Sequence, residues 1–316
     1  MNKTYVVANT IMGDRPEPFL PYCLESIHDA VDYLVLNDNS GNSNNPNLKY
    51  IKDSWIWKEG RVKLLPGLLS ELGGFHGARN ICLDETNKLG LNGDVWVLYL
   101  DCDEVHPESL TVLTRRILPV VSDNIGVVEG YFFQFLQSFK YYGSIDHRHN
   151  LLFRYNPAIR WIEPIHSKLV NIKGERFVTP YVYFHYGYVY SPENLYRRFE
   201  LYHEYGALPD LAPNGDILAE GLKTLIPEAL RFTGKHPKAI RQNIDILTEQ
   251  MKSYINNFEI AVNNYHLSNG KYSLKQLLKL ANFYTKLMSR QFGSVLKLFP
   301  HLSAFGLMGK LWDETF

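Results

Sequence analysis

The sequence predicts an α/β fold, in which a mixed sheet flanked by helices is followed by a helical C-terminal region. Strand-like and helix-like segments alternate through the first half of the chain, which is typical of an open sheet with helical connections. Residues 95–100 are almost entirely apolar, as expected of a strand buried in the middle of a parallel sheet. After Pro192 the hydrophobic pattern is helical to the end of the chain.

The first half contains four predicted strands and three predicted helices. Short apolar runs bounded by turn-forming residues predict strands at residues 5–11, 33–36, 62–65 and 95–100. Apolar residues at helical spacing predict a first helix over residues 19–31, with its apolar face formed by Leu20, Cys23, Leu24, Ile27 and Val31. Two more helices are predicted over residues 77–89 and 107–120, the last with Pro107 near its first turn, where proline is favoured.

The next part of the chain is rich in strands. Runs of apolar and β-branched residues predict strands at residues 125–135, 151–155, 159–162, 167–170 and 181–184. Few helical periods separate these runs. We therefore expect an antiparallel extension of the sheet.

The length of 316 residues predicts one core of about 200–250 residues with an appendage. We expect a main domain over residues 1–215 and a helical region over residues 216–316 that serves acceptor binding, dimerisation or contact with a membrane surface. The helical region carries an apolar stripe that can pack on the chain's own helices or pair two subunits in a homodimer: Ile240, Ile244, Leu247, Met251, Tyr254, Phe258, Ala261 and Tyr265. Residues 274–299 mix basic with apolar side chains, which is typical of a solvated helix face or of a membrane-surface helix.

The balance of charges and the number of cysteines argue against several classes of protein. Lys plus Arg and Asp plus Glu both number 33, so no overall charge favours nucleic acid as a partner. The three cysteines form no Cys-x-x-Cys pair, which argues against a disulfide framework or a structural zinc site. No apolar run resembles a signal peptide or a membrane span. We expect a cytoplasmic protein, or one peripheral to the inner face of the membrane through its C-terminal helices.

Three carboxylates follow the apolar strand at residues 95–100, at Asp101, Asp103 and Glu104. In open α/β sheets the carboxyl ends of the strands are where ligands bind. Carboxylates this close repel one another unless a cation neutralises them, and Mg²⁺ and Mn²⁺ prefer such oxygen ligands together with substrate phosphates. The pattern predicts a metal–diphosphate site that uses Mn²⁺ or Mg²⁺. The alternative is an acidic strand end that caps the following helix.

Two classes of enzyme place Asp-x-Asp at the end of a strand. In haloacid-dehalogenase-like phosphatases the first Asp is a nucleophile, and Asp101 fits that short pattern. That fold carries the motif on an early strand, however, whereas two βα units precede Asp101 here. The other class is the glycosyltransferases.

Three segments, in order, make the chain similar to glycosyltransferase family 2. Residues 33–40 look like the family's second strand with its acidic residue and Ser, and residues 77–80 look like the Ala-Arg-Asn that opens a helix before the central strand. Residues 98–104 look like the family's Leu-Asp-Ala-Asp-Glu. The resemblance covers about two-thirds of the chain, and it implies a GT-A-like, Rossmann-like mixed sheet with the C-terminal helices as an extension. It also implies transfer of a sugar from a nucleoside diphosphate sugar to a glycan, lipid-linked or other hydroxyl acceptor.

The resemblance assigns roles to four residues. It implies that Asp38 accepts hydrogen bonds from the nucleotide base and that Arg79 provides a planar cation for the nucleotide or its phosphates. Asp101 would hold the ribose or a metal-bound water, and Asp103 would bind the metal that stabilises the diphosphate leaving group. The alternatives are a turn residue at Asp38 and a surface ion pair at Arg79.

Residues later in the chain are candidates for the other side of the site. His185 lies in a His-Tyr-Gly segment common in related transferases and is expected to bind the metal or the diphosphate, or else to be structural. The resemblance favours an inverting transferase over a retaining one. Inversion needs a general base, for which Glu163 and His166 are the candidates. The family often has Glu after this histidine, where the chain has Ser167. A non-catalytic scaffold that binds sugar nucleotides is a third alternative.

Overall fold

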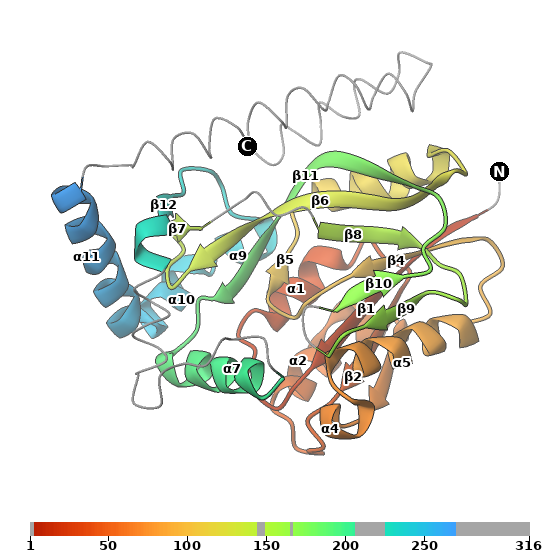
Figure 1. Cartoon of the computed structure of the whole chain (residues 1–316), viewed down its shortest axis with the longest axis horizontal. Helices are drawn as coiled ribbons and strands as arrows, with labels where there is room; N and C mark the ends of the chain where they lie inside the picture. The colour runs from red at the N-terminus through yellow and green to blue at the C-terminus, as the bar shows by residue number, and fades with distance from the viewer. Residues whose placement is uncertain (1–2, 144–148, 165–166, 206–224, 270–316) are drawn as a thin grey trace, which may run out of the picture.

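The computed structural model describes residues 3–143, 149–164, 167–205 and 225–269. Within these ranges the chain has a mixed α/β fold with a ten-stranded curled sheet, a separate two-stranded sheet and C-terminal helices (Figure 1). The described residues contain no helix that is long and apolar enough to span a membrane. The predicted basic segment at residues 274–299 and the predicted domain boundary near residue 215 lie outside the described residues.

Four parallel strands form the first half of the sheet. β1 (Thr4–Met12) lies between β2 (Tyr33–Asp38) and β4 (Asp94–Tyr99), and β3 (Val62–Pro66) pairs with the far side of β2. These are the four strands that the sequence predicts. The chain leaves β1 toward β2 and β3 and then returns to β4 on the opposite side of β1. The carboxyl ends of β1 and β4 therefore border a point at which the connections diverge, and such points form ligand-binding crevices.

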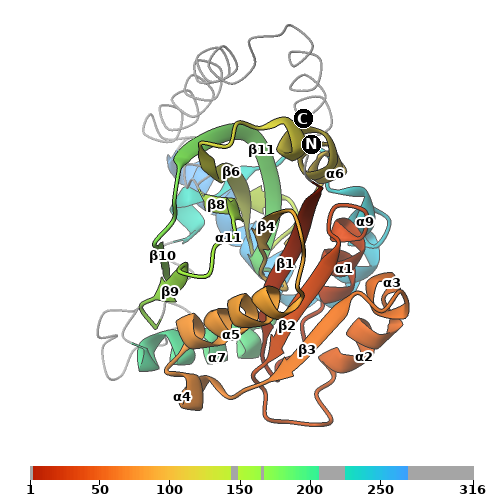
Figure 2. The same cartoon turned by 90° about the vertical axis from the view of Figure 1, so that its right-hand side faces the viewer.

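Helices cover both faces of these strands (Figure 2). α1 (Leu20–Ile27), α2 (Asn47–Asp53) and α3 (Trp55–Lys58) lie on one face, and α5 (Phe75–Lys88), preceded by the short α4 (Leu69–Leu72), lies on the other. The sequence predicts α1 and α5, although α1 ends at Ile27, before the expected residue 31.

The alternation of side chains along β1 explains the two-sided packing. Val6 and Ala8 are buried in the same cluster as Leu24 of α1, whereas Val7 is buried with Cys82 of α5. Successive side chains on a strand point to opposite faces, so a run of consecutive apolar residues is buried on both sides. All four predicted apolar residues of α1 that lie in the helix are buried.

The helix predicted over residues 107–120 is shorter and less regular than expected. α6 (Ser109–Val112) continues into one π turn at Leu113–Ile117 and one 3₁₀ turn at Leu118–Val120. Pro119 lacks a backbone N–H and cannot continue an α-helical hydrogen-bond pattern.

The second half of the sheet is mixed. β8 (His149–Arg154) runs antiparallel between β4 and β6 (Ile125–Leu136), as predicted. β11 (Glu175–Tyr188) instead runs parallel to β6, and the short β5 (Glu104–Val105) pairs antiparallel with β11. The edge beyond β6 is formed by two short strands, β7 (Tyr141–Tyr142) and β12 (Leu230–Arg231).

The prediction of a purely antiparallel extension is therefore wrong in two respects. β11 is parallel to its neighbour β6, and β9 (Arg160–Ile162) with β10 (Lys168–Val170) forms a separate two-stranded sheet. Hydrophobic pattern indicates where a strand lies but not which strand it pairs with, because pairing depends on the path of the connections.

The C-terminal helices pack on the sheet. α7 (Pro192–Glu204) lies at the edge where the parallel strands end, and α9 (Lys238–Arg241), α10 (Ile244–Gln250) and α11 (Lys252–Asn269) follow (Figure 1). The buried residues of the last three helices share clusters with strands β6, β7 and β11: Ile240, Leu247, Met251, Ile255, Phe258 and Val262.

The predicted apolar stripe is thus buried against the chain's own sheet. Phe258 is buried as predicted and Tyr254 packs partly buried against the cluster that contains Ile255, while Ile255 and Val262, which the predicted stripe omits, are also buried. From Leu247 to Val262 the buried residues recur at steps of three or four, which is the spacing of one helix face.

Candidate metal centre and its cavity

A cavity of about 360 Å³ lies at the carboxyl ends of the parallel strands. Its lining comes from the loops after β1, β2 and β4 and from α7, and it includes Asp14, Arg15, Glu17, Asn39, Ser40, Asp101, Asp103 and Arg198. The cavity therefore occupies the crevice that the strand order creates beside β1. Its volume is in the range of sites that bind small molecules.

A tight turn after β4 presents Asp101 and Asp103 to the cavity. The backbone N–H of Glu104 donates to the Asp101 carbonyl over 3.1 Å, and the backbone N–H of Asp101 donates to the Glu104 carboxyl group over 3.1 Å. Between them, the Cys102 thiol donates to the carbonyl of Ile11 on β1 over 3.3 Å. The turn is thus tied both to itself and to the neighbouring strand.

Glu104, the third carboxylate of the sequence cluster, is structural. Its side chain is buried, and burial, together with the charges of Asp101 and Asp103, raises its pKa well above the usual value. Glu104 is not among the three residues whose ligand atoms come together, and its carboxyl group instead accepts the backbone N–H of Asp101.

The β5–β11 pairing brings His185 to Asp103. His185 is opposite Glu104 in the antiparallel register, and the backbone N–H of Tyr186 donates to the Asp103 carbonyl over 2.9 Å. As a result His185 Nε2 lies 3.0 Å from Asp103 Oδ1. Asp101 completes a group whose three ligand atoms all lie within 4.8 Å of one another.

The atoms of this group fit a divalent cation. Asp103 Oδ1 and His185 Nε2 are both buried, and neither makes a hydrogen bond of acceptable geometry despite their proximity. Two adjacent ligands of an octahedral ion, each at about 2.1 Å, are about 3.0 Å apart. The separation of the two atoms thus matches a shared Mg²⁺ or Mn²⁺ ion. The two carboxylates suit either ion, and the imidazole, a ligand of transition metals, favours Mn²⁺ of the two.

The ionisation state of Asp103 also favours binding of a divalent cation. Burial alone would raise the pKa of this carboxyl group, but the neighbouring His185 and Arg198 side chains lower it well below the usual range. Asp103 is therefore ionised at neutral pH. This is the state that a metal ligand needs.

Arg79 fixes the orientation of Asp101. Its Nη2 atom lies 2.7 Å from Asp101 Oδ1, and its guanidinium carbon is 4.2 Å from the centre of the Tyr99 ring and 5.6 Å from that of Trp161. Arg79 is buried rather than a surface ion pair. Arg79 lines the cavity, and its guanidinium group forms an ion pair with Asp101.

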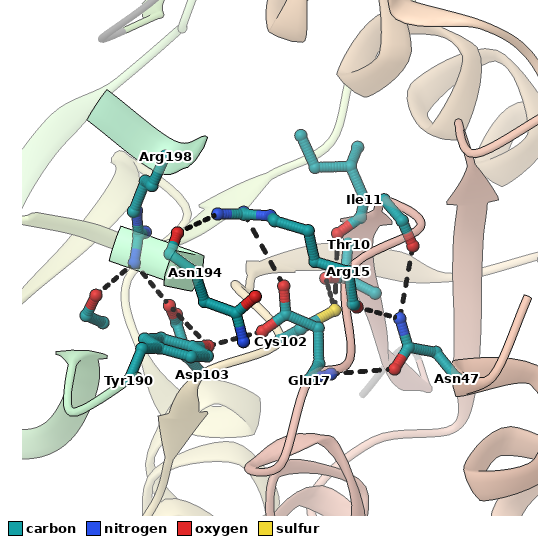
Figure 3. A network of polar contacts seen from close by, with 12 residues as sticks. Thr10, Ile11, Arg15, Glu17, Asn47, Cys102, Asp103, Tyr190, Asn194 and Arg198 are labelled. Carbon is teal, nitrogen blue, oxygen red and sulfur yellow. Dashed lines mark hydrogen bonds and ion pairs between the residues drawn. The ribbon is translucent and has the colours of Figure 1, made fainter. Parts of the chain in front are cut away.

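Two residues that the sequence analysis did not identify contact the other oxygen of Asp103 (Figure 3). Arg198 of α7 places Nη1 3.1 Å from Asp103 Oδ2 and also donates to the carbonyl of Gly187. The hydroxyl of Tyr190 lies 3.4 Å from the same oxygen and makes a short hydrogen bond to Glu17. No sequence motif marks Tyr190 or Arg198, because they reach Asp103 only through the placement of β11 and α7.

Glu17 is a third residue that the sequence analysis missed. It is buried in the loop after β1, and its backbone N–H donates to Asn47 Oδ1 over 2.9 Å (Figure 3). Burial and the charge of Asp103 raise the pKa of Glu17 to about 7, although Arg15, whose Nη2 is 3.8 Å from Oε1, opposes that rise. The position of Glu17 just after β1, at the same sheet edge as Asp101, is the signal that could have identified it.

The structure places Asp38 beside the cavity rather than among its lining residues. Asp38 Oδ1 accepts hydrogen bonds from the backbone N–H of Ser40 over 3.1 Å and from Asn45 Nδ2 over 3.0 Å. Its next two neighbours, Asn39 and Ser40, line the cavity. Asp38 Oδ1 thus stabilises the turn that follows β2, which is the alternative to recognition of the nucleotide base.

Of the two residues predicted as the general base, the structure describes Glu163 but not His166. Glu163 is 44% exposed, forms an ion pair of 2.8 Å with Lys168 and does not line the cavity. Ser167, whose hydroxyl donates to the Glu163 carbonyl, does line it. His166 lies outside the described residues.

Comparison with known proteins gives no family assignment, since no protein-family model matches the chain and no curated protein matches it significantly.

Proposed function

We propose that this protein is a metal-dependent glycosyltransferase, which moves a sugar from a nucleoside diphosphate sugar to a hydroxyl acceptor. The proposal rests on one observation above the others. The group of Asp101, Asp103 and His185 can hold a divalent cation, and its two carboxylates line a cavity at the carboxyl ends of the parallel strands. The mixed sheet is compatible with the GT-A-like arrangement that the sequence resemblance implies.

The charges around the cavity suit a diphosphate. The bound metal would neutralise the diphosphate as it leaves the sugar. Arg15 and Arg198 also line the cavity, and their planar guanidinium groups suit phosphate oxygens. Arg79 would act indirectly, by holding Asp101 in place.

An inverting transfer also needs a base that removes the proton of the acceptor hydroxyl. Glu163 and His166 remain the predicted candidates for this role. Through the hydrogen bond from Ser167 to the Glu163 carbonyl, the segment that carries Glu163 is connected to the cavity lining. We therefore propose that the acceptor enters on the side of Ser167.

A thermal-melting screen tests the proposal. UDP-, GDP-, dTDP- and CMP-sugars are each added with Mn²⁺ and, separately, with EDTA. A ligand at one hundred times its Kd stabilises the folded protein by about 2.7 kcal/mol. We expect at least one nucleotide sugar to raise Tm with Mn²⁺ and to lose that effect in EDTA, and we expect the same compound to be consumed on prolonged incubation.

The variant Asp103→Asn tests the site itself, with Asp123→Asn as the matched control because Asp123 is fully exposed. We expect Asp103→Asn to abolish stabilisation by nucleotide sugar plus Mn²⁺ and Asp123→Asn to retain it. Unchanged stabilisation of Asp103→Asn would reject the proposal. A beryllofluoride adduct at Asp101 with no nucleotide effect would favour the phosphatase hypothesis.

A further inference from the structure

The two carboxylate oxygens of Asp103 have opposite environments. Oδ2 receives Arg198 Nη1 at 3.1 Å and the Tyr190 hydroxyl at 3.4 Å, whereas Oδ1 has no hydrogen-bond partner and faces His185 Nε2. Each oxygen of an ionised carboxylate has two lone pairs. Arg198 donates to Oδ2, and the Tyr190 hydroxyl, whose single hydrogen is shared between Glu17 and Oδ2, contacts the same oxygen at the longer distance, whereas Oδ1 keeps both of its lone pairs for a metal.

The partners of Oδ2 are themselves held in place. Arg198 Nη1 also donates to the Gly187 carbonyl, and the Tyr190 hydroxyl makes its short hydrogen bond to the buried Glu17. Both donors come from the segment that follows His185, so one stretch of chain supplies a metal ligand and the groups that restrict its neighbouring ligand. Movement of either donor away from Oδ2 would break a second buried hydrogen bond.

Gly187 makes this close approach feasible. A Cβ atom at this position would lie 2.6 Å from His185 Nε2, 2.9 Å from Arg198 Nη1 and 3.1 Å from Asp103 Oδ2. Glycine therefore leaves space for the ligand His185 and for the donor Arg198 to reach the two sides of the same carboxylate.

We propose that Arg198 and Tyr190 are positioning residues that confine Asp103 to one-oxygen coordination and so make the site select small octahedral cations over Ca²⁺. Ca²⁺ takes six to eight oxygen ligands and often binds carboxylates through both oxygens, whereas Mg²⁺ and Mn²⁺ accept single oxygens in an octahedral shell. A carboxylate with one oxygen already occupied offers Ca²⁺ a single oxygen and cannot supply the second that the larger Ca²⁺ shell can use. The inference rests on the metal site of the proposed function and adds its selectivity.

The test measures Mn²⁺ and Ca²⁺ affinities by calorimetry with the full chain and no nucleotide. Tyr190→Phe removes one donor with little change of shape, and Arg198→Met removes the other. Tyr181→Phe is the matched control: Tyr181, which lies in β11, is buried like Tyr190, and its hydroxyl contacts His106 Nδ1 at 2.8 Å rather than the candidate metal ligands.

We expect the unmodified protein and Tyr181→Phe to prefer Mn²⁺ over Ca²⁺ by at least about tenfold, which is the lower end of the effect of groups that orient metal ligands. In Tyr190→Phe and Arg198→Met the preference should shrink several-fold, mainly because Ca²⁺ binds more tightly. The ratio of two affinities is measured on one protein sample, so partial unfolding of a variant does not change it.

The outcomes separate this inference from the proposed function. If the unmodified protein binds Mn²⁺ and both variants keep its Mn²⁺/Ca²⁺ ratio, the inference is wrong and the metal site stands. If it binds neither ion, the inference and the metal dependence of the proposed function are both wrong. If the ratio falls as expected while no nucleotide sugar stabilises the protein, the inference stands without the glycosyltransferase proposal.

Discussion

Glu17 keeps its proton to unusually high pH because its surroundings penalise the ionised form. Burial and the neighbouring negative charge of Asp103 raise its pKa from 4.5 to about 7. In the unfolded chain Glu17 is exposed to water and titrates near its ordinary value. The folded state therefore binds more protons than the unfolded state between these two pH values.

This difference predicts a pH dependence of stability. Because the pKa is higher in the folded protein, the contribution of Glu17 is fully present below pH 4.5 and is lost as pH rises through about 7. A shift of this size corresponds to on the order of 3 kcal/mol. Urea unfolding at pH 5 and pH 8 should show a larger loss of stability in the unmodified protein than in Glu17→Gln. Equal losses in the two proteins would contradict the assignment.

Gly187→Ala adds one methyl group beside the candidate metal centre. The added methyl group would force His185, Arg198 or Asp103 to move, because three of their polar atoms lie at 2.6–3.1 Å from its position. We expect Mn²⁺ affinity to fall by at least about tenfold, as for other losses of ligand orientation. Gly143→Ala is the control, since its methyl group would meet only the flexible side chain of Leu136, at 3.3 Å. Calorimetry with Mn²⁺ measures both variants, and a wild-type affinity in Gly187→Ala would be inconsistent with the observed crowding.

At the scale of elements, α11 joins the C-terminal region to the core of the sheet. Ile255 is 1% exposed and belongs to the cluster that includes residues of β6 and β11, whereas Ile260 is 58% exposed on the same helix. Burial of one face of a helix, rather than intrinsic helix propensity, supplies most of its stability in a folded protein.

The two isoleucines form a matched pair for mutation. Ile255→Ala should lower the free energy of unfolding by about 2–5 kcal/mol, because it removes buried methyl groups and leaves a cavity. Ile260→Ala should change it by less than about 0.5 kcal/mol, as is usual for exposed positions. Chemical denaturation monitored by tryptophan fluorescence gives both values. If both substitutions had the same small effect, α11 would not be packed on the sheet as described.

The elements that can be predicted from the sequence are those whose hydrophobic pattern lies within a short stretch of chain. The parallel strands, α1 and α5 have apolar patterns that require no knowledge of distant residues, and Asp101 and Asp103 follow directly from the apolar strand before them. The direction of β11 and the break at Met251 were not predicted, because each depends on which surfaces are available for packing after the chain has folded back.

At the scale of the whole molecule, the residues of the candidate site likewise divide into those with a local sequence motif and those without one. Asp101, Asp103, Arg79 and His185 were found from local sequence, and the structure brings the four together. The partners of Asp103 Oδ2 come from 87 and 95 positions further along the chain. No local pattern encodes such contacts, since they arise only when β11 and α7 reach the ends of β1 and β4.

Because of this long-range assembly, we expect the candidate metal centre to form late in folding. In the folded protein His185 is placed beside Asp103 by the pairing of β11 with β5 and β6, and contacts between distant parts of a chain form slowly because a large loop must close first. Interactions that are absent from the folding transition state slow unfolding and leave the folding rate nearly unchanged.

We therefore expect Mn²⁺ to lower the unfolding rate in stopped-flow fluorescence while refolding proceeds at the same rate with and without the ion. An acceleration of refolding by Mn²⁺ would show that the site forms early. A centre that forms late would let a bound ion slow unfolding, so the lifetime of the folded chain would depend on the supply of metal.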